Sequence, residues 1–323
     1  MSIRLSTFLQ SRVNVFIYQK LSWKVCLYYL MLLGRIYFLI NSKEKKEIES
    51  SVAHVFGQRK KNGQITSIKR KVFQGVLHHY YEKIYNAYES IERLKGFFQE
   101  CIVANDLNIL DRALSKGKGV LFVTGHYGAV EYIPIFLALN GYPVSVIAKF
   151  ATQQLEHSLC LKTRGIGLKL VNAEKERNLL KIIIEELKKN RIVFYECDEI
   201  EEWRPSSKKS MWFLRKMIGV DRSIDVIHKR TGAEIIFGLM HRFNLNRYRL
   251  ILEDFQDMSF DVSKMHNKVG ETVLRCMEKY IYSYPEEWYQ WKNYPVIQAL
   301  NVADVKIEKP VPVMLFKPAF NKV

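Results

Sequence analysis

The sequence from residue 120 to residue 131 reads VLFVTGHYGAVE. Its first four residues are apolar, and a short continuous apolar run of this kind predicts a buried β-strand. Gly125 and Gly128 follow, and glycine lets the backbone turn tightly. Residues 132–139 then have the composition of a helix. The stretch therefore predicts a strand, a turn and a helix in succession, with His126 in the turn.

The same alternation continues along the chain. Residues 143–148, 192–195 and 234–240 are expected to form further strands, and residues 248–252 alternate in the manner of an edge strand. Helices are expected over residues 174–189, 224–230 and 263–282. Strands that alternate with helices indicate an α/β fold with a mixed, mainly parallel sheet covered by helices.

Four regions are expected on this basis. Residues 1–43 form an N-terminal membrane-associating segment, and residues 44–116 form a helical region with a polar face. Residues 117–300 form the α/β core, and residues 301–323 form an extended tail containing prolines.

Composition narrows the class of protein. The chain has 323 residues, of which 48% are hydrophobic and 26% charged. This excludes a disordered chain and a polytopic membrane protein, and it allows a sizeable core. The five cysteines are odd in number, widely spaced and without a CxxC pair. We therefore expect reduced thiols rather than a disulfide framework, and no zinc site.

The formal net charge is +17, from 50 Lys and Arg against 33 Asp and Glu. Such an excess favours acidic partners, which include nucleic acid, an anionic membrane surface and acidic proteins or substrates. The 18 Tyr, 18 Phe and 5 Trp suit a lipid–water interface, but they also suit single-stranded nucleic acid. Charge and aromatic content alone do not choose among these partners.

An apolar run near the N-terminus covers residues 25–40, with Arg35 inside it and lysines on both sides. At about 16 residues it is shorter than the roughly 20 that a spanning helix needs. Three structures remain open. The run can lie in the membrane surface, which we favour. It can also be part of a single span extended by residues 13–18, or a helix buried in a soluble core.

The chemistry is expected in the turn after the first strand. No phosphate-binding loop, GxGxxG, GxSxG or HExxH motif occurs. In open α/β sheets, sites gather beyond the carboxyl ends of the strands, where His126 lies. Glu131, in the first turn of the next helix, is expected to hold one imidazole nitrogen. The other nitrogen is then free to take a proton from a hydroxyl.

The spacing of this pair is weak support by itself, because His266 and Glu271 share it. That second pair lies within an expected helix, where five residues turn the chain by about 500° and the side chains diverge. The position of His126 at a strand end, between two glycines, is what distinguishes the first pair.

At this point the sequence resembles a known family. Residues 125–131, GHYGAVE, are similar to the G-H-F-G-N-W-E motif of the lipid A biosynthesis acyltransferases, a branch of the lysophospholipid acyltransferase superfamily. Asp198-Glu199 is similar to that branch's D-Q pair. Residues 217–220 and 230–233 resemble its F-F-G-V and R-T-G-A segments, and residues 284–291 resemble its closing P-E-Q-W-F-W element. The chain differs from the pattern at Ala129-Val130, at Glu199 and at Asp221-Arg222-Ser223.

The resemblance implies an O-acyltransferase that moves a fatty acyl chain from acyl-ACP or acyl-CoA to a hydroxyl of a lipid A-like glycolipid. His126 would be the general base, oriented by Glu131. Arg164 would stabilise an oxyanion or bind an acceptor phosphate, and Asp198 would order the site, with Glu196 as the alternative carboxylate.

The resemblance implies no metal, no cofactor and no nucleic-acid partner. The location implied is the cytoplasmic face of a bacterial inner membrane. Two alternatives stay open: acylation of another lipid, such as a lysophospholipid or an aminolipid, and a non-catalytic membrane-binding protein on the same fold.

Overall fold

The protein is described here from a computed structural model, which places residues 5–9, 11–58, 60–150, 152–199, 203, 205–256, 258 and 269–297. The expected tail, residues 263–268 of the expected long helix, His266 and part of the charged segment 201–210 lie outside the described residues.

Helices make up the first part of the chain, both in the segment expected at a membrane and in the expected helical region that follows. Its helices are α1 (Leu5–Leu9), α2 (Arg12–Lys20), α3 (Trp23–Ile40), α4 (Ser42–Phe56), α5 (Asn62–Tyr88), α6 (Ile91–Cys101) and α7 (Asn108–Ser115).

The described residues form a seven-stranded sheet in the order β1-β9-β8-β2-β5-β3-β4. The strands are β1 (Ile102–Val103), β2 (Val120–Thr124), β3 (Val144–Ala148), β4 (Lys169–Asn172), β5 (Ile192–Glu196), β8 (Glu234–Asn244) and β9 (Arg247–Asp254). All neighbours pair in parallel except β8 and β9. The expectation of a mixed, mainly parallel sheet is therefore confirmed.

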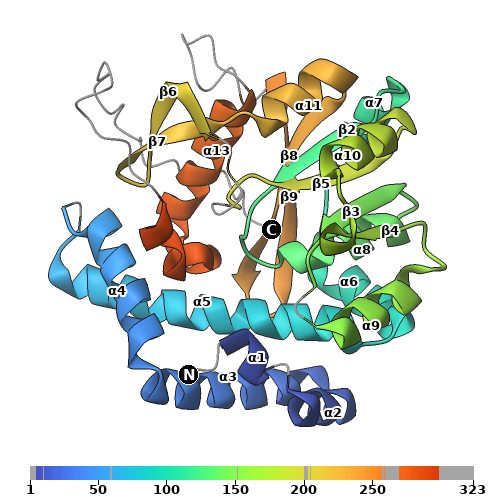
Figure 1. Cartoon of the computed structure of the whole chain (residues 1–323). Helices are drawn as coiled ribbons and strands as arrows, with labels where there is room; N and C mark the ends of the chain where they lie inside the picture. Colours follow the sequence, from blue (N-terminus) through green and yellow to red (C-terminus); the bar gives the residue numbers. More distant parts are fainter. Residues whose placement is uncertain are drawn as a thin grey trace.

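Helices follow the strands of this sheet. They are α8 (Ile133–Leu139), α9 (Gln153–Thr163), α10 (Leu179–Lys188), α11 (Ser223–Thr231) and α13 (Val269–Ser283), with single 3-10 turns η1 (Val130–Tyr132), η2 (Ala173–Lys175), η4 (Pro285–Glu287), η5 (Gln290–Lys292) and η6 (Tyr294–Val296). Helix α11 packs against both α10 and α13, whereas α8 packs against α6 and β3 (Figure 1).

Three details differ from the sequence-based expectation. The segment at 248–252 is not an edge strand, because β9 pairs with β8 on one side and with β1 on the other. The helix expected from residue 174 begins only at Leu179, since the Asn178 side chain accepts a hydrogen bond from the Lys181 amide and caps it there. Strand β4 and the antiparallel hairpin of β6 (Pro205–Phe213) and β7 (Lys216–Asp221) were not predicted.

Helix α5 is held firmly against the rest of the protein. Arg242 on β8 reaches Glu82 of α5 at 2.8 Å and Glu287 at 2.9 Å, and all three side chains are buried. Gly75 of α5 lies so close to the backbone of Glu286 that any side chain there would collide with it. Figure 1 shows α5 crossing one end of the sheet, with α1 to α3 on its far side.

Helix α3 has two unlike faces. Leu27, Leu30 and Phe38 are buried, whereas Tyr28, Leu32, Leu39 and others point outward. Among the described residues, no single helix is long and apolar enough to cross a membrane. One pair of helices passes such a test together, residues 25–40 with α4, but the two are bent by 94° at their junction.

Candidate active site

The turn after β2 is shaped by its two glycines. Gly128 has φ +55°, in the region that disfavours side chains, and a Cβ there would lie 2.0 Å from the Met240 carbonyl oxygen. At Gly125 a Cβ would meet the Met277 side chain at 2.8 Å and Asp198 Oδ1 at 3.1 Å. The turn therefore packs directly on its neighbours and holds His126 in one place.

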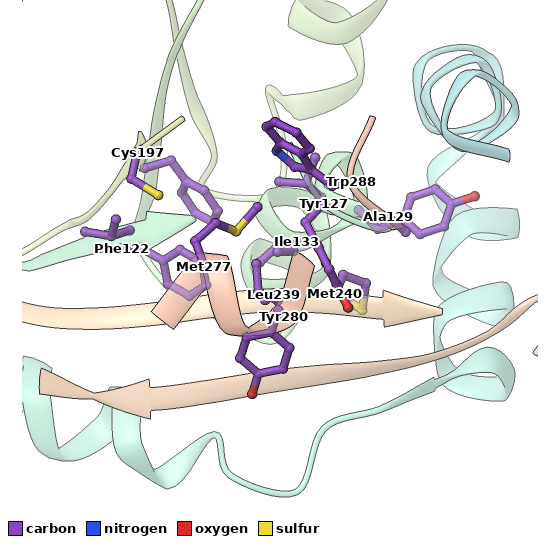
Figure 2. Packing of buried hydrophobic residues seen from close by; sticks show 14 of the residues in the cluster. Phe122, Tyr127, Ala129, Ile133, Cys197, Leu239, Met240, Met277, Tyr280 and Trp288 are labelled. Atoms are coloured by element: carbon purple, nitrogen blue, oxygen red, sulfur yellow. The ribbon is translucent and has the colours of Figure 1, made fainter. Parts of the chain in front are cut away.

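Apolar side chains from several elements pack against this turn. Figure 2 shows Trp288 beside Tyr127, with Leu239 and Met240 of β8 and Met277 and Tyr280 of α13 in the same cluster. Ala129, which stands at the Asn position of the motif G-H-F-G-N-W-E, is fully buried in this cluster. The backbone amides of Gly128 and Ala129 donate to the carbonyls of Glu287 and Met240 at 2.8 and 3.0 Å.

Strand register brings His126 to Asp198. Thr124 of β2 pairs with Glu196 of β5, and the ladder continues as the Cys197 amide donates to the Thr124 carbonyl. His126 and Asp198 each lie two residues beyond this last pair, and His126 Nδ1–H donates to Asp198 Oδ1 at 2.9 Å. The fully buried Asp198 carboxylate also accepts from the His126 backbone amide at 3.0 Å and from Trp288 Nε1 at 2.7 Å.

The other imidazole nitrogen faces two further carboxylates. His126 Nε2 lies 3.5 Å from Glu196 and 3.3 Å from Glu199, and the side chain is 15% exposed. Burial alone would lower the pKa of His126, but Glu196, Asp198 and Glu199 outweigh it and raise the pKa to about 10. Burial also raises the pKa of Glu196 to about 7, against the opposing influence of His126. The three carboxylates therefore favour the charged form of the His126 ring.

The expected hydrogen bond between His126 and Glu131 is not made. Glu131 lies in η1, and its carboxylate is 3.0 Å from the Lys83 ammonium of α5. Its backbone carbonyl accepts from the Asn86 side chain at 2.8 Å. Asp198 holds one nitrogen of the ring, Nδ1, in place of Glu131, because the parallel pairing of β2 and β5 brings the Asp198 carboxylate beside the ring.

Arg164 is not brought to the reaction centre. It follows the last residue of α9 and is exposed, and it does not line the cavity that contains His126. The cationic side chains of that cavity are instead Lys83, Lys149, Arg222 and Lys292. Lys83 was not named from the sequence, because it lies in the helical region, where no motif marks a site residue.

His126 opens onto a cavity of about 1270 Å³, larger than the ~300–1,000 Å³ typical of small-molecule sites. One part of its wall is polar and includes His126, Lys83, Glu131, Glu196 and Glu199. The rest is largely apolar and comes from β3, α9, β4, α10, β5, α11 and the residue before β4: Val146, Leu155, Leu159, Leu168, Leu170, Leu179, Leu180, Ile183, Phe194, Val226 and Ile227. The site thus combines a histidine–carboxylate pair with room for a long apolar chain.

Three side chains around Nε2 also bring together atoms of the kind that ligate a metal ion. His126, Glu196 and Glu199 each offer one ligand atom, and these atoms lie within 4.8 Å of one another. A nitrogen with two carboxylate oxygens is a donor set that a divalent transition metal accepts. The expectation that the reaction needs no metal stays a prediction.

A comparison with family models finds one match. The model of a family described as bacterial lipid A biosynthesis acyltransferase matches residues 11–292. A search of curated proteins finds no match. The matched range contains His126, Asp198, Lys83 and the closing segment around Trp288.

Proposed function

The chain belongs to the bacterial lipid A biosynthesis acyltransferase family, and from this membership we propose that it moves a fatty acyl chain from a thioester donor to a hydroxyl of a lipid A-like glycolipid. It is an acyltransferase by family. The single observation that carries the proposed mechanism is the pairing of His126 with the buried Asp198 at the mouth of an apolar cavity.

In this mechanism Asp198 keeps the proton of the neutral ring on Nδ1, so that Nε2 accepts one from the acceptor hydroxyl. The hydroxyl oxygen attacks the thioester carbonyl and forms a tetrahedral oxyanion. When the oxyanion collapses, the carbon–sulfur bond breaks and the imidazolium returns its proton to the departing thiolate. The products are an ester and a free thiol.

The cavity wall suits both parts of this reaction. Its apolar part, between α9, α10 and α11, would hold the acyl chain. Lys149, Arg222 and Lys292 at the wall would bind anionic groups of the acceptor or of the donor's phosphopantetheine arm. The net charge of +17 favours docking of an acidic carrier protein, so we propose acyl-ACP as the donor ahead of acyl-CoA.

The test uses the purified full chain with lauroyl-ACP or lauroyl-CoA, and with a lipid A precursor that lacks one acyl chain. Mass spectrometry should find the precursor heavier by one acyl group with lauroyl-ACP. A lysophospholipid and an amine-bearing lipid are offered in parallel. Acylation of one of these in place of the precursor would overturn the proposed acceptor, and absence of transfer to any of them would overturn the function.

Activity should rise with pH. The mechanism needs neutral imidazole, and below the raised pKa of His126 its fraction grows about tenfold per pH unit. The kcat/KM of the wild-type protein should therefore climb from pH 7 toward about 10. Glu196→Gln removes a carboxylate that raises this pKa. The rising part of the pH profile of kcat/KM, the limb, should therefore move to lower pH by about one unit or more. Glu185→Gln, on the exposed face of α10, should leave it in place. An unmoved limb in Glu196→Gln would contradict this electrostatic account.

We also propose that the N-terminal helices lie on a membrane surface. The outward residues of α3 recur every three or four positions and form one apolar stripe: Val25, Tyr28, Leu32, Ile36 and Leu39. Val13 and Phe16 of α2 are exposed as well. With Arg35 and the lysines at 43, 45 and 46 nearby, this composition suits the headgroup region of an anionic bilayer. The location that we propose is the cytoplasmic face of the inner membrane.

Charges placed in this stripe should weaken membrane binding. Burying one leucine side chain is worth about 1.5–3 kcal/mol, so Leu32→Glu with Leu39→Glu should lower the partition coefficient by at least ~100-fold. Sedimentation with vesicles of phosphatidylglycerol and phosphatidylethanolamine measures this. Leu161→Glu, at a leucine of α9 that is 50% exposed, is the control. Equal binding by both variants would refute the assignment of this face to the membrane.

A further inference from the structure

Lys83 and Glu131 form a second charged pair in the cavity of His126. The Lys83 ammonium lies 3.0 Å from Glu131 Oε1, and each side chain is 28% exposed. Both residues line the same cavity as His126, Glu196 and Glu199. They come from different elements, since Lys83 is on α5 and Glu131 is in η1, which follows the turn that holds His126.

Glu131 is itself well fixed, so it can hold Lys83 in place. Its backbone carbonyl accepts from Asn86, which lies almost one helical turn beyond Lys83 on α5. Helix α5 is fixed in turn by the buried contacts of Glu82 with Arg242. The ammonium therefore projects from a rigid helix toward a rigid turn, which is the arrangement that preorganised electrostatic stabilisation requires.

The charge of Lys83 is secure and acts within the site. Glu131 raises the pKa of Lys83, although burial opposes the shift. Burial lowers the pKa of His79 most, and the Lys83 ammonium is the next largest cause. The His79 ring lines the same cavity. The His79 ring stacks on Tyr289 at 3.4 Å between centroids, and Tyr289 meets the ring of His126 edge-on at 5.2 Å. Lys83 thus belongs to the side chains grouped around the reaction centre.

We propose that Lys83 stabilises the oxyanion of the tetrahedral intermediate, with Glu131 as its positioning residue. This inference rests on the proposed function. An ammonium group has three N–H donors, and the contact with Glu131 occupies one. The others can donate to the carbonyl oxygen as the hydroxyl oxygen bonds to carbon and the C=O electron pair moves onto oxygen. When the intermediate collapses, the electron pair on oxygen re-forms the C=O bond, the carbon–sulfur bond breaks and His126 protonates the thiolate. Lys83 neither gains nor loses a proton.

This assigns the role that Arg164 was expected to play to a residue of the helical region. It also gives Glu131 a different task from the one expected, because the carboxylate acts through Lys83 and not through His126. The cavity then contains two oriented pairs: His126 with Asp198 for the proton, and Lys83 with Glu131 for the negative charge.

The experiment measures steady-state kinetics of the purified full chain with lauroyl-ACP and the lipid A precursor. Release of the ACP thiol is followed, so that slow hydrolysis by water is counted together with transfer. Lys83→Met should lower kcat by about 10²–10³-fold with KM nearly unchanged, because the lost interaction exists mainly in the transition state. Lys83→Arg keeps the charge and should recover part of the loss.

A double-mutant cycle tests the role of Glu131. Glu131→Gln should lower kcat less than Lys83→Met does, and the double variant should resemble Lys83→Met alone, because Glu131 acts through Lys83. Lys71→Met is the matched control. Lys71 is on the same helix and is also ion-paired, with Glu286 at 3.8 Å, but it does not line the cavity. It should keep the wild-type kcat.

Three outcomes would overturn the inference. In the first, Lys83→Met raises KM and spares kcat, which would make Lys83 a ground-state binder. In the second, Lys83→Met matches Lys71→Met. In the third, the two losses simply add, which would remove Glu131 as the positioning residue. His126→Ala is run beside them: if it is inactive while Lys83→Met is normal, this inference alone fails. If His126→Ala keeps full activity, the proposed mechanism fails.

Discussion

His126→Ala is expected to lower acyl transfer by about 10²–10⁴-fold while the protein keeps its fold. The imidazole is the one group in the site that is oriented by a buried carboxylate and whose second nitrogen opens onto the cavity. In the proposed mechanism its loss removes the base that takes the hydroxyl proton and the acid that returns it to the thiolate. The measurement is kcat/KM with lauroyl-ACP, together with a thermal unfolding curve of each protein.

The control for this result is His157→Ala. His157 is exposed on α9 and does not line the cavity of His126. It should leave both activity and unfolding unchanged, which separates loss of the base from loss of any histidine. Wild-type activity in a folded His126→Ala protein would refute general-base catalysis by this residue.

Asp198→Asn is expected to damage activity comparably, by about 10³–10⁴-fold, and to destabilise the fold as well. The carboxylate accepts from His126 Nδ1, the His126 amide and Trp288 Nε1. An amide has one acceptor oxygen, so its NH₂ group must face one of these donors. Each buried donor left without an acceptor costs about 1–3 kcal/mol. If the amide nitrogen faces the ring, the imidazole proton moves to Nε2 and the base is lost.

Kinetics and unfolding curves of Asp198→Asn should be compared with those of Glu199→Gln. Glu199 lies only 3.3 Å from Nε2, on the opposite side of the ring from Asp198. Its amide should keep the tautomer and retain activity at high pH. Similar kinetics in the two variants would mean that Asp198 does not set the state of the ring.

The strand–turn–helix around His126 could be predicted because its signals are local. Apolar runs, glycines and helical periodicity are properties of neighbouring residues, and β2, β5 and β8 began where the sequence indicated. Strand β4 was missed because only four residues form it and none of them is fully buried. The β6–β7 hairpin was missed because its first strand is polar and charged.

The partner of His126 could not be identified from the sequence, although Asp198 was named as a site residue. The residue nearest along the chain, Glu131, was preferred, yet the ring binds a carboxylate 72 residues away. The parallel register of β2 and β5 decides between them, and register is a property of the assembled sheet. The position of Arg164 outside the cavity could not be predicted for a related reason, since a resemblance along the chain says nothing about which side chains face a cavity.

The sequence by itself determined the α/β class and the family, and it singled out the histidine proposed as the base, because these depend on short patterns read along the chain. The tertiary structure alone decided which charges meet. It paired His126 with Asp198 and Lys83 with Glu131, and it brought helix α5 over the end of the sheet. Coulombic and hydrogen-bonding energies depend on separation in space, and packing sets that separation for residues far apart in sequence.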